Sequence, residues 1–312
     1  MNRIIRYWNQ NRKNIIITVA IIAFIIIIIR IINSMYAKVN TSIVSNNVKD
    51  DEYQPTKSVI TGESVSYEIT SGNKNEIDNF VNYCNNKEYE KAYEFLTEDC
   101  KEEYSNSVEQ FKQQYASKIF SKIKTYDIEL WLKNGNDYTY RVTYYDDNLL
   151  ETGGKNINNN IQDYITVVNR NNEKKININS FIEKKTLTKS KSESNIEIIV
   201  NSKKIYKNYE EYSFIIRNKT DKIIRLTDEK NGKNICVRDE NNVEYSSLLT
   251  DISTNELELK PGFEKNINIK FNKIYDTGKN VKEICFKGII KDYERYMQNE
   301  NMEKVEVEID VR

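Results

Sequence analysis

The spacing of apolar and polar residues divides the chain into four stretches. Residues 15–36 are largely apolar, and the eighteen residues 15–32, interrupted only near their end by Arg30, reach about 27 Å at about 1.5 Å each, just enough to cross a hydrocarbon core. Residues 37–74 are polar and rich in Asn, Ser and Thr. Apolar residues recur at helical spacing over residues 75–119, and from residue 124 onward they alternate with polar ones. The pattern predicts a membrane-spanning helix, a linker, a helical stretch and a long run of strands.

Residues 75–119 carry the signals of three helices. Asn73 and Glu76 form a predicted capping box ahead of the first helix. Thr97 and Ser107 are the predicted N-caps of later helical segments, because a hydroxyl in that place accepts a hydrogen bond from an otherwise unpaired backbone N–H.

Strand-like alternation follows the helices. Tyr126–Leu132 and Tyr138–Tyr145 flank Asn134-Gly135, a dipeptide that favours a tight hairpin turn. Residues 164–168 and 175–182 supply two further strands. The pattern predicts a four-stranded antiparallel sheet with one face covered by the three helices.

The remaining chain is predicted to be a second domain. Residues 183–195 contain EKKTLTKSKSES and are predicted to form an interdomain linker. Over residues 196–312 short alternating stretches recur at roughly 8–12 residue spacing, which favours a β-sandwich. Pro261-Gly262 marks one of its turns. A single β-rich domain continuous with the first part is the alternative that the charged linker disfavours.

Two resemblances accompany these patterns. The helical stretch IDNFVNYCNNKEYEKAYEFLTEDCKEEYSNSVEQF, with the strands YDIELWL, YTYRVTYY, DYITVV and KININSF, resembles the nuclear-transport-factor-2-like (NTF2-like, cystatin-like) superfamily. That superfamily includes isomerases and dehydratases, and also binding modules of bacterial envelope proteins such as inner-membrane subunits of type IV secretion and conjugation machines. The stretch LELKPGFEKNINIKF is similar to Ig-like domains of Gram-positive surface proteins, which implies an adhesive, spacer or partner-binding module.

The predicted fold class is therefore α+β: an N-terminal transmembrane helix, an NTF2-like α+β cone domain and then an all-β Ig-like sandwich. The predicted domains are residues 1–14 (cytoplasmic tail), 15–36 (transmembrane helix), 37–74 (linker), 75–182 (NTF2-like domain), 183–195 (linker) and 196–312 (Ig-like domain).

The basic residues Arg3, Arg6, Arg12 and Lys13 precede the apolar run, so the positive-inside rule predicts a cytoplasmic N-terminus and an extracytoplasmic bulk, held at the cell membrane by a single-pass signal anchor. A cleaved signal peptide is the competing interpretation, but the apolar run is long for one and Met35 is poorly suited to the −3 position of a cleavage site.

Composition removes several classes of function. The 47 basic and 47 acidic residues cancel, which argues against nucleic acid as a partner. The chain has no histidine, which excludes histidine triads and histidine metal ligands. With only 9 glycines, phosphate-cradling glycine-rich loops are not expected either. We therefore predict no catalytic residue, no cofactor and no metal site.

Four cysteines could form two disulfides within the predicted domains, because an outward location permits them. The simplest pairing joins Cys84 to Cys100 and Cys236 to Cys285, the second bridging the two sheets of the sandwich. The alternative is that all four are buried thiols that act as small hydrophobic residues.

The strand Tyr138–Tyr145 suggests a ligand surface. Tyr138, Tyr140 and Tyr144 share one face and could line the mouth of the cone, where an apolar or sugar ligand would bind. The alternative is that tyrosine simply favours strands.

Two acidic motifs are predicted to be plain turns. Asp276-Thr277-Gly278 occurs once, whereas an aspartic protease needs two such aspartates. The loop after Asp146 lacks the glycine and glutamate of a calcium-binding hand.

The leading functional hypothesis is a non-enzymatic, single-pass envelope protein that binds an envelope protein partner or a ligand. The alternative is an enzyme acting on a small apolar molecule, with Asp127, Glu129 and Tyr140 as the acid–base groups, since histidine is absent. A third possibility, a sensor, would need a signalling partner because the cytoplasmic tail is so short.

Overall fold

The structure is a computed structural model that describes residues 56–146, 160–171, 173–228, 233–250, 252–275, 279–299, 301–302 and 304–312. The predicted cytoplasmic tail and transmembrane segment 15–36 lie outside these residues, as do the Asp276-Thr277-Gly278 motif and the loop that follows Asp146.

The helices precede the first large sheet in the chain. They are α2 (Tyr67–Asn85), α3 (Tyr89–Glu94), α4 (Glu98–Glu102), α5 (Val108–Phe111), the π-helical turn η1 (Lys112–Ala116) and α6 (Ser117–Ile119). Thr97 and Ser107 accept hydrogen bonds from the backbone N–H groups of Cys100 and Gln110, which confirms both predicted caps. Asn73 is no cap, because α2 begins at Tyr67 and leaves Asn73 buried inside the helix.

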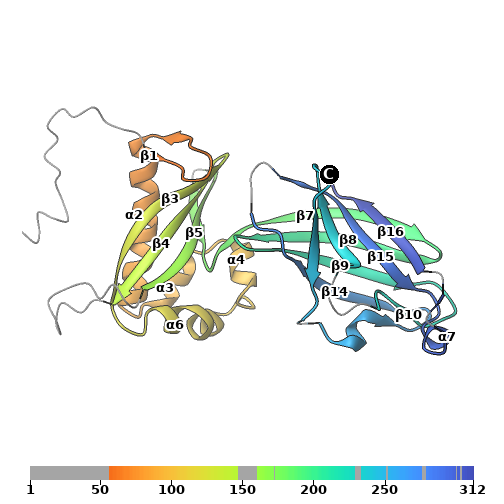
Figure 1. Cartoon of the computed structure of the whole chain (residues 1–312). Helices are drawn as coiled ribbons and strands as arrows, with labels where there is room; N and C mark the ends of the chain where they lie inside the picture. The colour runs from red at the N-terminus through yellow and green to blue at the C-terminus, as the bar shows by residue number, and fades with distance from the viewer. Residues whose placement is uncertain are drawn as a thin grey trace, which may run out of the picture. The chain divides into compact units, whose positions relative to one another are not determined.

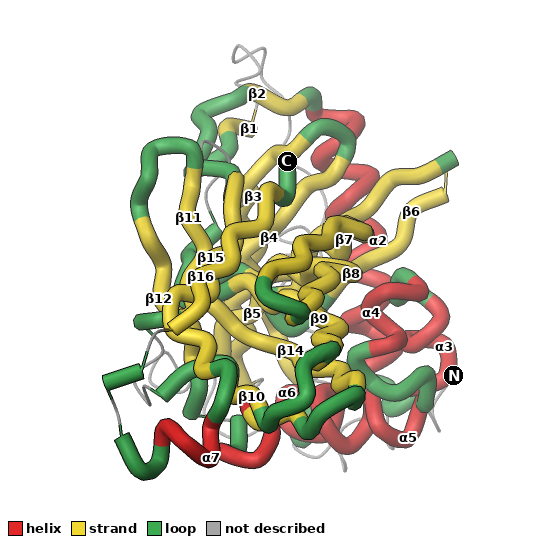
Figure 2. Tube along the Cα trace, turned by 90° about the vertical axis from the view of Figure 1, so that its right-hand side faces the viewer, coloured by secondary structure: helices red, strands yellow, loops and turns green. Residues whose placement is uncertain are grey.

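A four-stranded antiparallel sheet packs against these helices (Figure 1, Figure 2). Its strands are β3 (Lys124–Asn134), β4 (Asp137–Asp146), β5 (Asn160–Arg170) and β6 (Glu173–Asn177), in that spatial order, and a short hairpin of β1 (Thr56–Lys57) and β2 (Ser64–Val65) precedes α2. Gly135 adopts a left-handed backbone with φ +59° in the β3–β4 turn, which confirms the predicted hairpin.

The first hydrophobic core lies between these helices and the sheet. α2 contributes Ile77, Phe80 and Val81, and the sheet contributes Ile165 and Val167, all fully buried. The helical periodicity predicted from the sequence therefore corresponds to the face of α2 that this sheet covers.

The second part of the chain is built from strands. They are β7 (Phe181–Glu193), β8 (Ile196–Tyr206), β9 (Glu210–Asn218), β10 (Ile224–Arg225), β11 (Ile235–Asp239), β12 (Glu244–Leu248), β13 (Glu258–Leu259), β14 (Glu264–Phe271), β15 (Val281–Ile290) and β16 (Lys304–Asp310). A 3₁₀ turn, η2 (Thr254–Leu257), and a short helix, α7 (Tyr293–Tyr296), lie between them.

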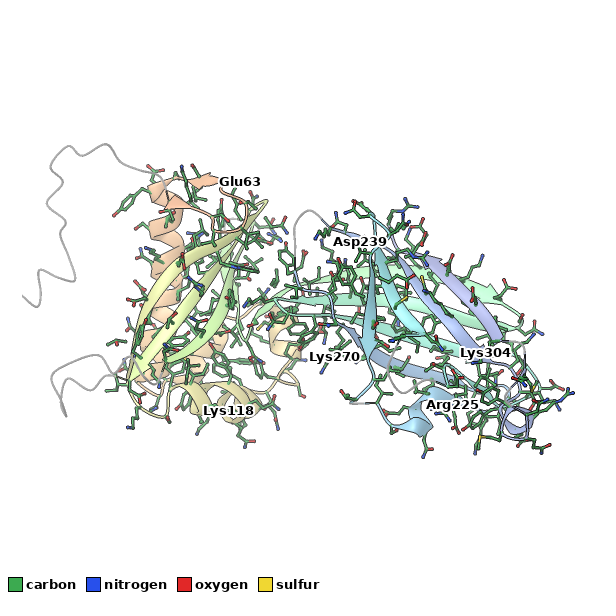
Figure 3. All side chains as sticks on the ribbon, in the orientation of Figure 1. Glu63, Lys118, Arg225, Asp239, Lys270 and Lys304 are labelled. Carbon is green, nitrogen blue, oxygen red and sulfur yellow. The ribbon has the colours of Figure 1, made fainter. Side chains whose placement is uncertain are left out.

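These strands form two layers joined through β12. One end of β12 pairs with β11, and its other end, at Ser247 and Leu248, pairs with β14. The layer containing β7, β8, β9 and β14 therefore folds onto the layer containing β10, β11, β13, β15 and β16. Side chains fill the space between them (Figure 3), and the rings of Phe214 and Phe286 meet edge to face at 5.5 Å.

The predicted linker 183–195 is instead most of β7 and its turn into β8. Backbone pairs run from Phe181–Tyr206 to Glu193–Ile196, so the charged residues lie on a regular antiparallel hairpin. The prediction was wrong because β7 exposes much of its side-chain surface to solvent, and exposed strand residues have the same polar composition as a linker. Pairing with β8 supplies the backbone hydrogen bonds that composition does not reveal.

The predicted fold class, α+β with an N-terminal transmembrane helix and an NTF2-like cone, is wrong. Strands make up 49% and helices 21% of the described chain, so the protein is mainly β. No helix among the described residues is long and apolar enough to cross a membrane, and the predicted transmembrane segment 15–36 lies outside those residues.

Candidate functional site

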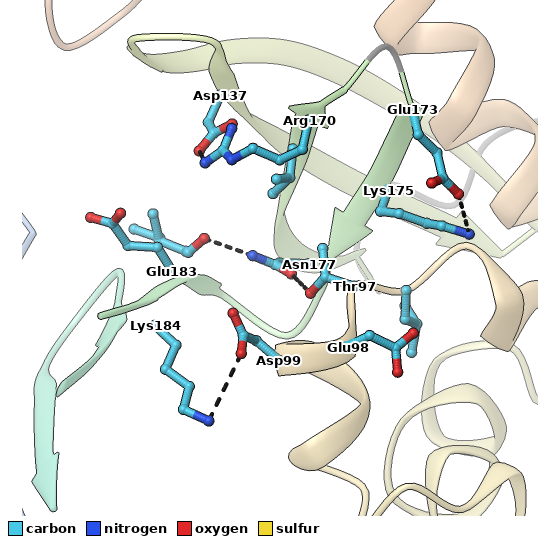
Figure 4. Close-up of a pocket in the computed structure, with 13 residues that line it drawn as sticks. Thr97, Glu98, Asp99, Asp137, Arg170, Glu173, Lys175, Asn177, Glu183 and Lys184 are labelled. Atoms are coloured by element: carbon cyan, nitrogen blue, oxygen red, sulfur yellow. Dashed lines mark hydrogen bonds and ion pairs between the residues drawn. The ribbon is translucent and has the colours of Figure 1, made fainter. Parts of the chain in front are cut away.

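A polar pocket of about 600 Å³ lies where α4, β5, β6 and the start of β7 meet (Figure 4). Charged side chains of both signs line it: Glu98, Asp99, Asp137, Arg170, Glu173, Lys175, Glu183 and Lys184. Leu96, Val168 and Ile182 add apolar surface. The pocket is therefore a mixed polar surface with some apolar wall.

One side of the pocket is a two-pronged ion pair. Both terminal nitrogens of Arg170 donate to the carboxylate of Asp137, with 2.6 Å between Nη2 and Oδ2. Asp137 starts β4 and Arg170 ends β5, so the antiparallel pairing of these strands brings the two ends together. The carboxylate raises the pKa of the Arg170 guanidinium, which stays charged and remains 60% exposed.

The opposite side of the pocket is held by the start of α4. The hydroxyl of Thr97 caps this helix and also contacts the amide oxygen of Asn177 on β6. The amide nitrogen of Asn177 donates to the carbonyl oxygen of Ile182 at 2.7 Å. Asn177 therefore ties α4 to the beginning of β7 beside the pocket.

Lys184 bridges β7 and α4. Its Nζ lies 2.5 Å from Oε2 of Glu102 and 3.8 Å from Oδ1 of Asp99. The hydrogen bond to Glu102 raises the pKa of Lys184. Partial burial raises the pKa of Asp99, and Lys184 opposes that shift.

The tyrosines predicted to face a ligand are core residues. Tyr138, Tyr140 and Tyr144 share one face of β4, as expected, but that face is the one that packs on the helices, and their exposures are 6%, 0% and 0%. Tyr140 accepts a hydrogen bond from the amide nitrogen of Asn73 at 3.2 Å. They pack in the first core and do not line the polar pocket.

The residues of the alternative enzyme hypothesis do not come together. Asp127 and Glu129 lie on the exposed face of β3, where Glu129 pairs with Arg141 of β4. Tyr140 lies opposite Leu130, on the buried face of the same sheet. The sheet itself separates the two carboxylates from the phenol, so they cannot act on one substrate.

All four cysteines are buried thiols in this structure. Cys84 of α2 and Cys100 of α4 lie in the first core, and burial raises the pKa of both thiols, to about 12 for Cys100. Cys236 and Cys285 are directly opposite one another on β11 and β15, so they belong to one layer and do not bridge two sheets as predicted.

Glu283, Cys285 and Glu308 bring their ligand atoms within 4.8 Å of one another. Arg238 occupies the place of a cation there, because its Nη1 lies 2.8 Å from Glu283 and 3.3 Å from Glu308. Both carboxylates already pair with this guanidinium, so the cluster is an ion-pair network on the sheet.

The comparisons with known proteins give little guidance. Neither a protein-family model nor a curated protein matches this chain. A solved structure of a conserved hypothetical protein from Bacillus anthracis is similar to 33% of this chain and covers 89% of its own length, with 17% identity and a TM-score of 0.25. A similarity of that size does not indicate the fold or the function of this chain. The functional proposal is therefore argued from the residues of the site.

Sequence reasoning missed the pocket residues Thr97, Asn177 and Arg170 as a group. Thr97 was visible as a helix cap, but its contact with Asn177 joins positions eighty residues apart in the chain. Asp137 directly precedes one predicted strand and Arg170 lies two residues after the end of another, and an antiparallel meander places such ends side by side. In the sequence, this order of strands is the signal that places Arg170 near Asp137.

Proposed function

We propose that the chain from residue 56 onward is a binding module without catalytic activity, and that its polar pocket receives a polar segment of a partner protein. The observation that carries this proposal is the lining of the pocket, where acidic and basic side chains together surround a hollow of about 600 Å³. A pocket for a small apolar molecule would be lined mainly by apolar and aromatic side chains. Protein segments, by contrast, offer charges of both signs together with backbone donors and acceptors.

Exchange of ion-pair partners supports binding of such a segment. Exposed ion pairs contribute about 0–1 kcal/mol, so an incoming carboxylate or ammonium can replace one partner at little cost. The guanidinium of Arg170 is 60% exposed and the carboxylate of Glu98 is 83% exposed, so both are accessible from solvent. The hydrogen bond from buried Asn177 to Ile182 holds the start of β7 in place while the exposed charged side chains of the pocket exchange ion-pair partners.

Site-specific photo-crosslinking in the cells that make the full-length protein tests this proposal. A benzophenone amino acid replaces Glu98 at the pocket, and in a control protein it replaces Lys118, which is exposed on α6 (Figure 3). We expect one discrete protein adduct from position 98 and none of the same mass from position 118. No adduct at position 98, or the same adducts from both positions, would overturn the proposal.

A charge reversal gives a second test with a matched control. Asp99→Lys replaces a pocket carboxylate with an ammonium group and should reduce the adduct from position 98 by about tenfold or more, because a cationic partner group that pairs with Asp99 would then face a like charge across the interface, which costs several kcal/mol. Lys118→Glu changes the charge by the same magnitude in the opposite direction, away from the pocket, and should leave the adduct unchanged. Equal yields in the two variants would contradict a role for the pocket.

A further inference from the structure

A second, smaller pocket of about 280 Å³ contains buried lysines. Lys273 and Glu210 are both 3% exposed, and their Nζ and Oε1 atoms lie 2.8 Å apart. Lys203, which is 12% exposed, lies 3.9 Å from the other oxygen of Glu210. Burying an ammonium group costs free energy unless opposite charges lie beside it. The number of carboxylates that face the lysines of this pocket therefore determines whether the pocket can bind an anion.

A β-bulge places Lys203 on the inner face of the sandwich. Val200 pairs with Phe214, whose ring lies in the second core, and the register of β8 on β9 then shifts by one residue. Beyond that bulge Lys203 pairs with Tyr212, which is also fully buried. Because paired residues of an antiparallel sheet share a face, the bulge turns the Lys203 side chain toward the core side.

Lys203 also faces a like charge. Its partner on β7 is Lys185, directly opposite in the β7–β8 hairpin. Like charges in this arrangement repel and destabilise a sheet unless an anion lies between them. Glu183, two residues before Lys185, pairs with Lys185 itself at 2.9 Å.

The carboxylates of the pocket are already engaged. Oε1 of Glu210 accepts from Lys273, and Oε2 accepts from the hydroxyl of Tyr212 at 2.7 Å. Among the described residues, no acceptor lies within hydrogen-bond distance of the Lys203 ammonium group. Burial lowers the pKa of Lys203, with Lys185 and Lys273 acting in the same direction and Glu210 and Glu183 opposing them.

We propose that this pocket binds a small oxyanion of the phosphate class, with Lys203 as its principal ligand. Three ammonium groups and two carboxylates line the pocket, which leaves one positive charge for the anion to neutralise. A volume of about 280 Å³ exceeds the roughly 30 Å³ that one water occupies in the liquid, so the pocket can hold an oxyanion and part of its hydration shell. Asn280, also in the lining, adds a neutral polar group. This pocket shares only Glu183 with the pocket of the proposed function, and its test does not depend on that function.

Calorimetric titration of the full-length protein tests the proposal. Inorganic phosphate and glycerol phosphate are titrated separately at constant ionic strength kept with chloride, since screening alone changes surface electrostatics. We expect one equivalent of an oxyanion to bind. Tighter binding of inorganic phosphate would identify the free ion as ligand, and tighter binding of the ester would identify a phosphomonoester. Failure of both to bind would overturn the proposal.

Two variants locate the site. Lys203→Met removes the ammonium group and keeps an unbranched side chain, and it should weaken binding by about tenfold or more. Lys191→Met, at an exposed position of β7, is the matched control and should bind like the wild type. If Lys203→Met binds as tightly as the control, the assignment is wrong.

Lysine acetylation of the wild-type protein provides a test that needs no variant. Acetic anhydride labelling is followed by mass spectrometry of peptides, with and without phosphate. Bound phosphate should protect Lys203 and leave Lys191 unprotected. Equal labelling of Lys203 in both conditions would contradict the proposal even if Lys203→Met failed to fold.

Discussion

At the scale of single residues, two buried carboxylates hold turns of the backbone. Asp163 accepts from the hydroxyl of Tyr115 at 2.7 Å and from the backbone N–H groups of Asn179 and Ser180 at 3.0 and 2.9 Å. Those two residues have left-handed backbones, with φ of 58° and 62°, and need such support. Asp239, labelled in Figure 3, accepts similarly from backbone N–H groups in the β11–β12 turn.

Asp163→Asn should destabilise the protein by about 3 kcal/mol, because an amide nitrogen cannot accept the hydrogen bonds that a carboxylate oxygen accepts. Tyr115→Phe removes one donor and should cost about 1 kcal/mol. Chemical denaturation measures both. Asp221→Asn, at an exposed position, is the control and should stay within about 0.5 kcal/mol of the wild type. A cost no larger for Asp163→Asn than for the control would contradict this role.

At the scale of elements, the pairing between strands determines which side chains lie close enough to react with one another. Cys236 and Cys285 face one another because β11 and β15 pair in that register. Opposite residues of an antiparallel pair have Cα atoms about 4.5–5.5 Å apart, inside the range that a disulfide spans. A hydrogen bond from the neighbouring thiol lowers the pKa of Cys236, so we expect Cys236 to be the attacking sulfur of the pair.

Oxidised glutathione should therefore join Cys236 to Cys285. The Cys236 thiolate attacks the glutathione disulfide and releases one glutathione thiol. Cys285 then displaces the second, so two protein thiols become one disulfide. Peptide mass spectrometry after thiol blocking should show this bond, and Cys285→Ser should prevent it. We expect Cys84 and Cys100 to remain thiols, because burial raises the pKa of both and they lie on two helices, where no strand pairing holds them opposite one another. A Cys84–Cys100 bond with Cys236 still reduced would contradict the prediction.

At the scale of the whole molecule, one hairpin contributes to both hydrophobic cores. Phe181 at the start of β7 and Tyr206 at the end of β8 belong to the first core, with their rings 5.4 Å apart. Ile196 and Ile198, at the other end of the same hairpin, belong to the second core. The residues from 55 onward accordingly form one compact unit.

Phe181→Ala should lower the stability of this whole unit by about 3–5 kcal/mol, the usual cost of removing a buried aromatic ring. Because the hairpin serves both cores, calorimetry should show one unfolding transition that moves to lower temperature. Ile123→Ala is the control, since Ile123 is 56% exposed, and it should leave the transition nearly unchanged. A second transition that stays at the wild-type temperature would show that the two cores unfold independently.

The sequence by itself determined the periodic elements. The alternation of Ile267, Ile269 and Phe271 predicts β14, and the hydroxyl of Thr97 predicts the start of α4, because both signals depend on near neighbours in the chain. The Asn134-Gly135 turn is local in the same sense.

Only the tertiary structure decided which faces are covered and which distant groups meet. The face of β4 that carries Tyr140 and Tyr144 packs in the first hydrophobic core, although alternation alone could not distinguish a core face from a ligand-binding face. The charged residues of β7 form a strand because their backbone pairs with β8. Lys203 turned inward because of a bulge in that pairing. Each outcome depends on contacts between segments far apart in the chain, and periodicity carries no information about the partner.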